Sequence, residues 1–384
     1  MIRTEAWVIR LRDDAAPAEL TLEELELADA EADEVVVAPL YGCWEGNMSH
    51  ALRRRPVDVC RLRLEPRVVL GNAGVVRVVA VGAAIRDLRE GDACVLMPMG
   101  AADPHGFLTR VFGYDARGSV GMLAKRTKLK REQLFRIPQP SRHTLEQWAG
   151  VSIRYLTAYD NWKVTNACYR AQMTERDDPS PWAWGWGGGV SLAELSLAQR
   201  AGWNVAMVAS TDARLAQIEA ANIKPVDRRT FPDLSFEAAR FESDADYRRR
   251  YMQSEATFLR CVRELSGERR VAVFIDNVGG PVHRATLRAL GRQGVVTSSG
   301  WDQGGTLTSN RIEACMNRHI HVHTHGMRQS VGVEACEFIA DSDWIPPPGQ
   351  PVWAFADIPD LARRFTAGSL DTYFPLFEVN ADLI

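Results

Sequence analysis

A glycine-rich segment in the middle of the chain carries the strongest chemical signal in the sequence. Residues 184–191 read Trp-Gly-Trp-Gly-Gly-Gly-Val-Ser, and the candidate cofactor contacts are Gly185, Gly187, Gly188, Gly189 and Val190. A dinucleotide pyrophosphate needs bare backbone N–H groups and a helix N-terminus aimed at it. Gly185 is expected to allow a tight turn and Gly188 a close approach of the phosphates, while Ser191 stands at the third glycine position of the usual fingerprint. The flanking strand and helix patterns predict a nucleotide site, with a purely structural loop as the alternative.

The end of the next strand indicates which dinucleotide this site prefers. An acidic residue there would hold a ribose 2′-hydroxyl and favour NAD. The strand ends at Ser210-Thr211, and Asp212 lies beyond it. Ser210 and Arg214 could instead hold a 2′-phosphate, so the sequence predicts NADPH, although Arg214 could equally be a solvated helix residue.

Alternating histidines near residue 320 are the oddest feature of the sequence. His319, His321, His323 and His325 are half of the chain's eight histidines. On a strand, all four would face one side. They could chelate zinc or copper, or they could line a cleft or a subunit interface.

The elements that must position these residues fall into two patterns. Up to about residue 155, β-branched runs bounded by Gly, Asp and Pro predict a small barrel or sandwich. From there to about residue 319, strands alternate with helices, which predicts a parallel sheet with right-handed crossovers. Residues 225–268 are rich in Arg, Asp and Glu and are expected to form a helical surface insertion.

Bulk composition excludes several classes of protein. The 384 residues carry a formal net charge of −3, which argues against a nucleic-acid partner. No apolar run is long enough for a membrane span, and the charged start does not resemble a signal peptide, so we expect a cytoplasmic protein. The seven cysteines are scattered and never spaced Cys-x-x-Cys, which disfavours a disulfide framework or a structural zinc loop.

With these residues in hand, the chain resembles the medium-chain dehydrogenase/reductases over nearly its full length. The motifs that carry the resemblance are Gly71-Asn72-Ala73-Gly74-Val75-Val76, Gly91-Asp92, Leu156-Thr157-Ala158-Tyr159 and Asp276-Asn277-Val278-Gly279-Gly280. Within that superfamily it is most similar to the crotonyl-CoA carboxylase/reductase and enoyl reductase branch. The turn at Trp184-Gly185 with Gly188-Gly189 and the stretch Cys261–Gly267 are similar to segments of that branch.

The resemblance implies a fold, a domain layout and further site residues. It implies an α/β fold in which a GroES-like, partly open β-barrel, residues 1–155 completed by 320–384, accompanies a Rossmann domain at 156–319. It implies a homodimer with the active site between the domains. The implied catalytic residues are Asn47, Tyr114 and His325, with His323 as the alternative histidine. Further cofactor contacts implied are Thr157, Asn277, Val278, Ser299 and Gly300.

The zinc site of the related alcohol dehydrogenases is not expected in this chain. Those enzymes carry Gly-His-Glu where this sequence has Gly71-Asn72-Ala73, and Cys43 alone cannot hold a metal. Zinc-free members of the superfamily mostly reduce activated carbon–carbon double bonds. The resemblance therefore implies NADPH-dependent reduction of an α,β-unsaturated acyl thioester, with hydride going to the β-carbon and possible reductive carboxylation.

Two other functions stay open at this point. One is a quinone or enone reductase without a thioester preference, and the other is a non-catalytic cofactor-binding homologue. The basic run Lys125–Arg131 could attract the phosphates of a CoA or carrier-protein thioester, or it could be a solvated face.

Overall fold

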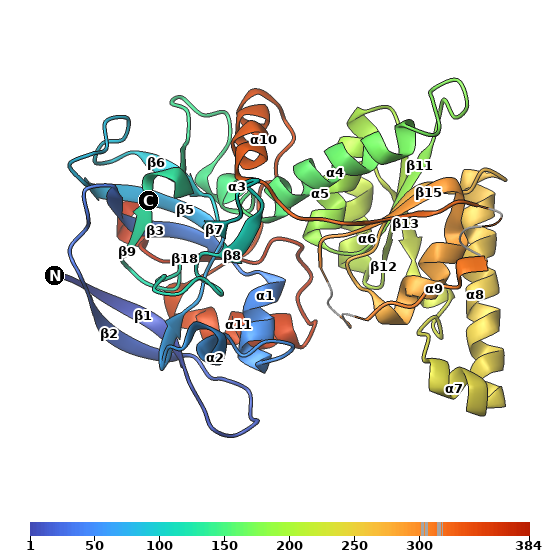
Figure 1. Cartoon of the computed structure of the whole chain (residues 1–384), viewed down its shortest axis with the longest axis horizontal. Helices are drawn as coiled ribbons and strands as arrows, with labels where there is room; N and C mark the ends of the chain where they lie inside the picture. The colour runs from blue at the N-terminus through green and yellow to red at the C-terminus, as the bar shows by residue number, and fades with distance from the viewer. Residues whose placement is uncertain (301–302, 304–305, 313–315, 317) are drawn as a thin grey trace. The chain divides into compact units, whose positions relative to one another are not determined.

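The chain folds into two compact units. The computed structural model describes residues 1–300, 303, 306–312, 316 and 318–384. Unit 1 comprises residues 1–156 and 327–384, and unit 2 comprises residues 157–326 (Figure 1). Cys315 lies outside the described residues, and the six described cysteines are free thiols.

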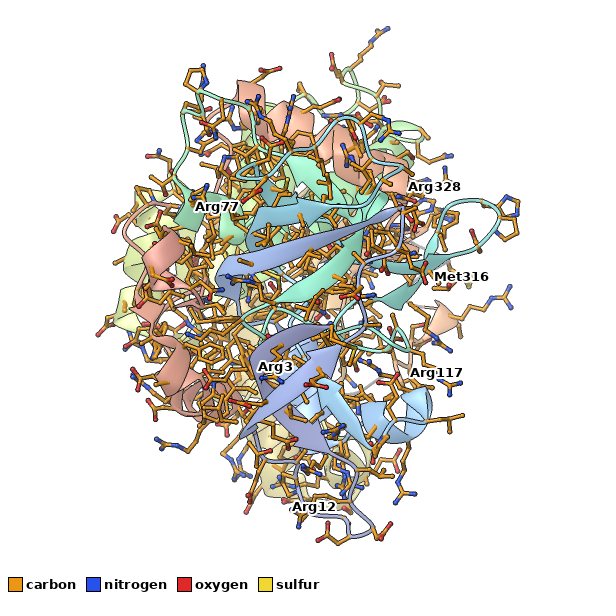
Figure 2. All side chains as sticks on the ribbon, turned by 90° about the vertical axis from the view of Figure 1, so that its left-hand side faces the viewer. Arg3, Arg12, Arg77, Arg117, Met316 and Arg328 are labelled. Carbon is orange, nitrogen blue, oxygen red and sulfur yellow. The ribbon has the colours of Figure 1, made fainter. Side chains whose placement is uncertain are left out.

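Unit 1 is built mainly from antiparallel strands. A three-stranded sheet has the order β2-β1-β4, a larger sheet has the order β10-β6-β5-β3-β18-β17 with β9 also on β3, and β7 pairs with β8. The strands are β1 (Ile2–Arg10), β2 (Thr21–Leu27), β3 (Glu34–Cys43), β4 (Arg67–Val69), β5 (Gly74–Val81), β6 (Ala93–Leu96), β7 (Met99–Ala102), β8 (Leu108–Val111), β9 (Thr127–Lys130), β10 (Leu134–Arg136), β17 (Val352–Trp353) and β18 (Leu376–Glu378). Arg3 in β1 and Arg77 in β5 mark the two main sheets in Figure 2.

Two apolar clusters hold unit 1 together. One lies within the larger sheet, where Val35 and Val37 of β3 pack with Val76 and Val78 of β5. The other joins β1 to the helices, and it includes Trp44 and Phe377. The helices of this unit are α1 (Gly46–Arg53), α2 (Val59–Arg63), α3 (Leu145–Ala149), α10 (Gln329–Asp341) and α11 (Ile358–Thr366).

Unit 2 contains one parallel sheet of six strands in the order β13-β12-β11-β14-β15-β16. In chain order the strands are β11 (Trp182–Trp186), β12 (Asn204–Ala209), β13 (Lys224–Asp227), β14 (Val271–Ile275), β15 (Leu290–Ser298) and β16 (His321–Thr324). This is the order 3-2-1-4-5-6 of a doubly wound dinucleotide-binding sheet. Such sheets bind ligands at the carboxyl ends of their strands, where the order reverses between β11 and β14.

Helices cover both faces of this sheet. Trp184 and Trp186 alternate with Gly185 along β11, and both tryptophans pack with Phe258 of α8 on one face. On the other face, Gly185 lies against Leu195 of α5. The helices are α4 (Arg154–Arg170), which continues from the end of unit 1, α5 (Gly189–Arg200), α6 (Asp212–Ala220), α7 (Ala238–Ser243), α8 (Ala245–Ser266) and α9 (Gly280–Ala289).

Local sequence explains where several of these helices begin and end. Leu192, Leu195 and Ala198 of α5 are buried at helical spacing, and Gly202 follows the helix with a φ of 82°. The prediction of a helical surface insertion at 225–268 is wrong at its start, because residues 225–227 belong to β13, an edge strand of the sheet. The segment then forms α7 and α8, with Tyr251 on the buried side of α8. No helix among the described residues is both long and apolar enough to cross a membrane.

Candidate active site

The glycine-rich turn lies at the carboxyl end of β11, as the sequence indicates. Gly185, which is expected in the turn, lies in the strand instead. Gly185 is inside the strand, and a Cβ there would lie 3.3 Å from side-chain atoms of Ser191 and Leu195. Gly185 therefore allows α5 to pack closely on β11, and the turn itself falls at Gly187 and Gly188. Gly188 has a φ of 153°, and a Cβ added to it would meet no atom of the described residues within 4 Å.

This turn presents the N-terminus of α5 next to open space. Gly188 caps the helix without a side-chain hydrogen bond, and Gly189 and Val190 begin it. The first N–H groups of a helix have no intrahelical acceptor and carry the positive end of its dipole. The half-buried backbone from Gly187 to Val190 can therefore receive phosphate oxygens.

Side-chain hydrogen bonds connect the loops that follow three parallel strands. Asn277, after β14, places its amide nitrogen 3.5 Å from the Ser191 hydroxyl. Its amide oxygen accepts from the backbone N–H of Ser299 at 2.8 Å and from the Ser299 hydroxyl at 3.0 Å. Val278 and Gly300 are half-buried beside them. The structure thus brings together the predicted contacts after β11, β14 and β15, while Thr157 is half-buried in α4.

His325 lies at the same edge of unit 2. Its backbone N–H donates to Ser298 at 2.9 Å, and its Nδ1 is 4.0 Å from the carboxylate of Asp160 in α4. Burial, together with the neighbouring His323, lowers the pKa of His325 to about 4, so the imidazole is neutral near pH 7. Its Nε2 is buried and has no hydrogen-bond partner among the described residues. A neutral imidazole of this kind can accept a proton or hydrogen-bond a ligand.

The prediction that all four histidines share one strand face is wrong at His319. β16 contains only His321 and His323, whereas His319 has a left-handed φ of 53° and therefore lies outside the strand alternation. His321 Nε2 lies 2.8 Å from the Gln293 side-chain oxygen, and the rings of His323 and His325 are 6.4 Å apart.

A buried polar network lies behind the glycine turn. Asn161 of α4 donates to Glu194 of α5 at 2.8 Å and accepts from the Thr297 hydroxyl of β15 at 2.7 Å. Burial raises the pKa of Glu194 to about 8, against a smaller lowering by Asn161. Glu194 is therefore mostly protonated at neutral pH, and it links α4, α5 and β15 as a neutral group.

At the end of β12, Ser210 and Arg214 are the predicted contacts for a 2′-phosphate. They lie on either side of Asp212, whose carboxylate already pairs with an arginine. Ser210 is exposed, and Arg214 is half-buried in the first turn of α6. The Asp212 carboxylate accepts from Arg229 Nη2 at 2.6 Å. Arg229 also binds Asp227. The arginine offsets the negative charge that would otherwise oppose a phosphate here.

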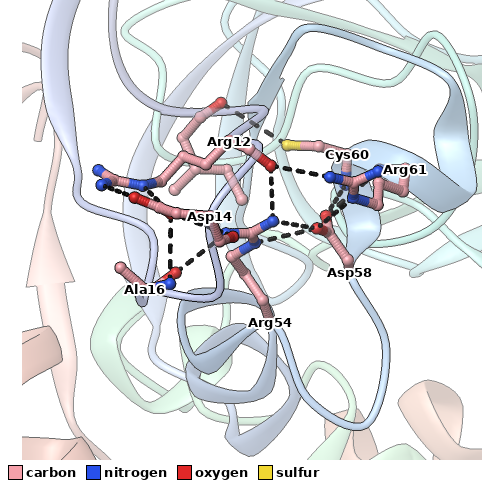
Figure 3. Close-up of polar contacts among 8 residues, drawn as sticks. Arg12, Asp14, Ala16, Arg54, Asp58, Cys60 and Arg61 are labelled. Carbon is pink, nitrogen blue, oxygen red and sulfur yellow. Dashed lines mark hydrogen bonds and ion pairs between the residues drawn. The ribbon is translucent and has the colours of Figure 1, made fainter.

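In unit 1, Asn47 is half-buried in the first turn of α1, and its side-chain oxygen has no hydrogen-bond partner in the part of the chain that the structure describes. The other end of α1 is anchored by Arg54 (Figure 3). Its guanidinium donates to the carbonyls of Arg12 at 2.8 Å and Ala16 at 3.0 Å, and to the Asp58 carboxylate at 2.9 Å. These contacts fix the helix that carries Asn47.

Tyr114 lies on the same apolar cluster as α1. It is half-buried and packs against the cluster that contains Met48 and Ala51 of α1. Burial raises the pKa of its hydroxyl to about 12, so the phenol stays protonated at neutral pH. Gly113, which precedes it, accepts a backbone hydrogen bond from Gly71 at 3.0 Å. The candidates Asn47 and Tyr114 therefore belong to unit 1, and His325 belongs to unit 2.

A buried arginine lies next to Cys43. The Arg154 guanidinium donates to the Cys43 sulfur at 2.6 Å, to the Glu45 carboxylate and to the Trp44 carbonyl at 2.7 Å. Burial raises the pKa of Glu45 to about 7, and Arg154 opposes that rise. A permanent positive charge thus stands beside the only cysteine that could be a remnant of a metal ligand.

Comparison with known proteins identifies the fold. No family model matches the chain, and no curated protein sequence matches it. Among solved structures, it resembles the 2-octenoyl-CoA carboxylase reductase CinF from a Streptomyces species, in complex with NADP and 2-octenoyl-CoA. The TM-score is 0.79 at 19% identity, covering 99% of this chain and 88% of CinF. The chain has the fold of these carboxylase/reductases.

Two further structures support this identification. The crotonyl-CoA carboxylase/reductase AntE, in complex with NADP, matches with a TM-score of 0.79 at 20% identity, covering 99% of this chain and 95% of AntE. A thermostable alcohol dehydrogenase from Pyrobaculum aerophilum matches at 0.71 and 15% identity, covering 98% of this chain and all of that one. The predicted resemblance to the medium-chain dehydrogenase/reductases is confirmed at the level of the fold, a Rossmann sheet with a GroES-like barrel.

The carboxylase/reductase-like fold of this chain positions several polar residues that the sequence did not point to. They are Glu45, Arg154, Asp160, Asn161 and Glu194. Apart from the adjacent Asp160 and Asn161, these residues are scattered along the chain, and their partners lie far away in the sequence. Arg154, for example, meets Cys43 from 111 residues away. Only the presence of a charged residue inside an apolar stretch could have drawn attention to them.

The basic run at 125–131 is largely neutralised. Lys128 pairs with Glu34 at 2.8 Å, Lys130 with Asp33 at 3.0 Å, and Arg131 with Asp87. This argues against the run as a phosphate-attracting surface.

The structure gives no support to a zinc or copper site at the four histidines. No group of three or more His, Cys, Asp and Glu side chains could hold a metal within the described residues, which are 1–300, 303, 306–312, 316 and 318–384.

Proposed function

We propose that this protein is an NADPH-dependent reductase of α,β-unsaturated acyl thioesters. The observation that carries the proposal is the convergence, at the carboxyl edge of the unit 2 sheet, of the bare glycine turn, the Asn277–Ser299 pair and His325. One structure with the same fold, that of CinF, holds NADP and 2-octenoyl-CoA together. We further propose that unit 2 is the dinucleotide-binding domain and unit 1 the substrate domain.

The residues of unit 2 fit the proposed cofactor. The open backbone at Gly188 and the N-terminus of α5 suit a pyrophosphate. Ser210 and Arg214 suit a 2′-phosphate, because the nearby Asp212 is engaged by Arg229. When bound, NADPH supplies a hydride for reduction of a polarised double bond.

Three residues are assigned to the substrate. Hydride addition at the β-carbon moves negative charge onto the thioester oxygen, and preorganised hydrogen-bond donors stabilise such charge. We assign this role to the Asn47 amide and the Tyr114 hydroxyl, which stays protonated at neutral pH. His325, neutral and with a buried unpartnered Nε2, is assigned to the α-carbon side, where a proton or CO₂ is added.

We propose that the reaction uses no zinc. The position beside Cys43 is taken by the Arg154 guanidinium, which is held by Glu45 and the Trp44 carbonyl. A fixed cation in contact with the sulfur opposes binding of a second cation there. The stabilisation of the developing oxyanion is therefore assigned to hydrogen-bond donors.

A substrate panel tests the proposal. NADPH oxidation is followed with crotonyl-CoA, octenoyl-CoA, a quinone and an aldehyde, each with and without bicarbonate. We expect turnover with an enoyl-CoA, and mass spectrometry of the product shows whether CO₂ has been added. Turnover of the quinone alone would favour a quinone reductase, and turnover of the aldehyde alone would contradict the proposed chemistry. Tight NADPH binding without any turnover would favour a non-catalytic cofactor-binding protein.

A further inference from the structure

Unit 2 contains a hollow at the edge of its sheet opposite the glycine turn. The hollow has a volume of about 680 Å³. It lies where β14 and β15 begin, since Arg270 immediately precedes β14 and Gly291 is in β15. Asn277 and the glycine turn lie beyond the other ends of the strands. At about 3.3 Å per residue, Arg270 and Asn277 are separated by roughly 20 Å of extended chain.

The lining of this hollow is strongly basic. Its arginines are Arg263, Arg269, Arg270, Arg288, Arg292 and Arg318. Its carboxylates are Asp177, Asp178 and Glu268. The guanidiniums thus outnumber the carboxylates two to one, in a chain whose formal net charge is −3.

Four of these arginines are held in place by the protein. Arg269 pairs with Asp178 at 3.0 Å, and Arg288 pairs with the buried Glu255. Arg270 donates to the Arg288 carbonyl at 3.2 Å, and Arg318 donates to the Leu290 carbonyl at 3.2 Å. Their positive charges are therefore fixed around the hollow.

The other two arginines are available to a ligand. Within the described part of the chain, the side chains of Arg263 and Arg292 make no ion pair and no hydrogen bond. Both are exposed, one at the end of α8 and the other in β15. When Glu255, which pairs with Arg288, is counted with the three lining carboxylates, two arginines remain in excess. The carbonyl ends of α8 and α9 contribute only about half a negative charge each, which is less than this excess. The lining therefore keeps a net positive charge.

The backbone beneath the arginines is tightly packed. A Cβ added to Gly291 would lie 2.0 Å from the Arg269 carbonyl oxygen, so the turn before β14 packs directly on the β15 backbone. Arg270 has a left-handed φ of 60° in that turn. Leu259 and Met173 add an apolar part to the lining. The hollow is thus a preformed site with fixed cations and an apolar side.

We propose that this hollow binds a small molecule that carries adjacent phosphate groups. Guanidinium groups match phosphate oxygens through paired hydrogen bonds, and several converging arginines favour an anion with more than one charge. The volume is in the range of small-molecule sites. The shared chemistry of the ligand is a diphosphate, which either inorganic pyrophosphate or a nucleotide can supply.

Calorimetric titration of the full-length protein with sodium pyrophosphate, and separately with ATP, tests this proposal. The titrations are made at low ionic strength with NADPH at saturation, so that the glycine turn is occupied. We expect both ligands to bind, and tighter binding of ATP would indicate that Leu259 and Met173 contact the nucleoside. Neither outcome depends on catalytic activity, so the test is independent of the proposed reaction.

Paired variants with the same loss of charge make the test specific. Arg263→Ala with Arg292→Ala should weaken pyrophosphate binding at least tenfold, because a hydrogen bond to a charged group contributes about that factor. The control is Arg249→Ala with Arg250→Ala, exposed positions about 20 Å away along α8 at 1.5 Å per residue. The proposal would be overturned if pyrophosphate did not bind, if NADPH displaced it, or if both double variants weakened its binding equally. Tighter binding of a DNA duplex through the same arginines would also overturn it.

Discussion

At the residue scale, two of the proposed site residues each have a buried polar atom that forms no hydrogen bond with the described residues. Asn47 Oδ1 and His325 Nε2 are both in this state. Leaving a buried donor or acceptor unsatisfied costs about 1–3 kcal/mol, so such atoms are uncommon unless a ligand or water completes them. Their occurrence at positions selected from the sequence supports the assignment of these residues to substrate or cofactor.

Replacing Asn47 with alanine should reduce turnover without a comparable loss of cofactor. Removal of one preorganised donor to a developing oxyanion typically lowers kcat by about a hundredfold or more. Steady-state kinetics with an enoyl-CoA and fluorescence titration with NADPH measure the two effects. Asn204→Ala, an exposed asparagine at the start of β12, is the control and should keep normal turnover. An Asn47→Ala variant with unchanged kcat would remove Asn47 from the reaction.

Arg214 should decide the preference between the two cofactors. Arg214→Ala is expected to weaken NADPH binding by about 1–3 kcal/mol, the range for a charge-assisted hydrogen bond, and to leave NADH binding nearly unchanged. Titration of both cofactors measures this difference, and the exposed Arg249→Ala serves as the control. If the wild-type protein binds NADH as tightly as NADPH, the assignment of Ser210 and Arg214 is wrong.

At the element scale, the candidate residues are held by contacts distant from them in sequence. α1, which carries Asn47, is joined through Arg54 to the loop at residues 12–16 and to Asp58 at the start of α2 (Figure 3). α5, which follows the glycine turn, is joined through Glu194 and Asn161 to α4 and β15. These two anchors position Asn47, which is proposed to contact the substrate, and the glycine turn, which is proposed to contact the cofactor.

Loss of the Arg54 anchor should destabilise unit 1. The Arg54 side chain is only 10% exposed, and its removal takes one donor each from the carbonyls of Arg12, Asp14 and Ala16 and from the Asp58 carboxylate. Arg54→Ala should lower the free energy of unfolding by about 2–3 kcal/mol. Urea denaturation measures this, with Arg12→Ala as the control because Arg12 pairs only with exposed Asp14 through its side chain. Equal stability of both variants would show that the anchor is unimportant.

Glu194 should make stability depend on pH in an unusual direction. Its folded pKa of about 8 lies above the ordinary glutamate value of 4.5, so the folded protein retains a proton that the unfolded chain releases. The free energy of unfolding should therefore fall as the pH rises from the unfolded pKa to the folded pKa. The fall should be about 1.4 kcal/mol per pH unit at most. Glu194→Gln, which is neutral at every pH, should remove this fall.

Urea denaturation of the wild type and Glu194→Gln between pH 5 and pH 8 checks this prediction. The difference in unfolding free energy should shift in favour of the variant as pH rises, because contributions from all other groups cancel in the comparison. A difference that stays constant over this range would mean that Glu194 is ionised in the folded protein.

At the scale of the whole molecule, the sequence predicted the architecture better than the site. Alternating strands and helices with a glycine turn indicated a doubly wound sheet, and β11 to β16 form that sheet. Local periodicity and turn chemistry determine such features, so they can be predicted from a single sequence. The motif order further indicated the fold shared with the carboxylase/reductases.

The parts that could not be predicted depend on contacts made across the fold. The pairing of Asp160 with His325 and of Arg154 with Cys43 requires the three-dimensional arrangement of distant segments. The alternation of histidines suggested a longer strand than the chain forms, because His319 adopts a left-handed conformation before β16. The sequence of the basic run at 125–131 did not indicate that Glu34 of β3 and Asp33 of the preceding loop would pair with it. The homodimer stays a prediction.

The central claim is that hydride passes from NADPH to the β-carbon of an α,β-unsaturated thioester. The most direct test is a single turnover with NADPH deuterated at C4 and crotonyl-CoA, followed by mass spectrometry and NMR of the product. We predict that deuterium appears at the β-carbon, and that the α-carbon carries either a solvent proton or a carboxyl group. Deuterium at the thioester carbon or the α-carbon, or a reduced product without deuterium, would contradict the proposed reaction.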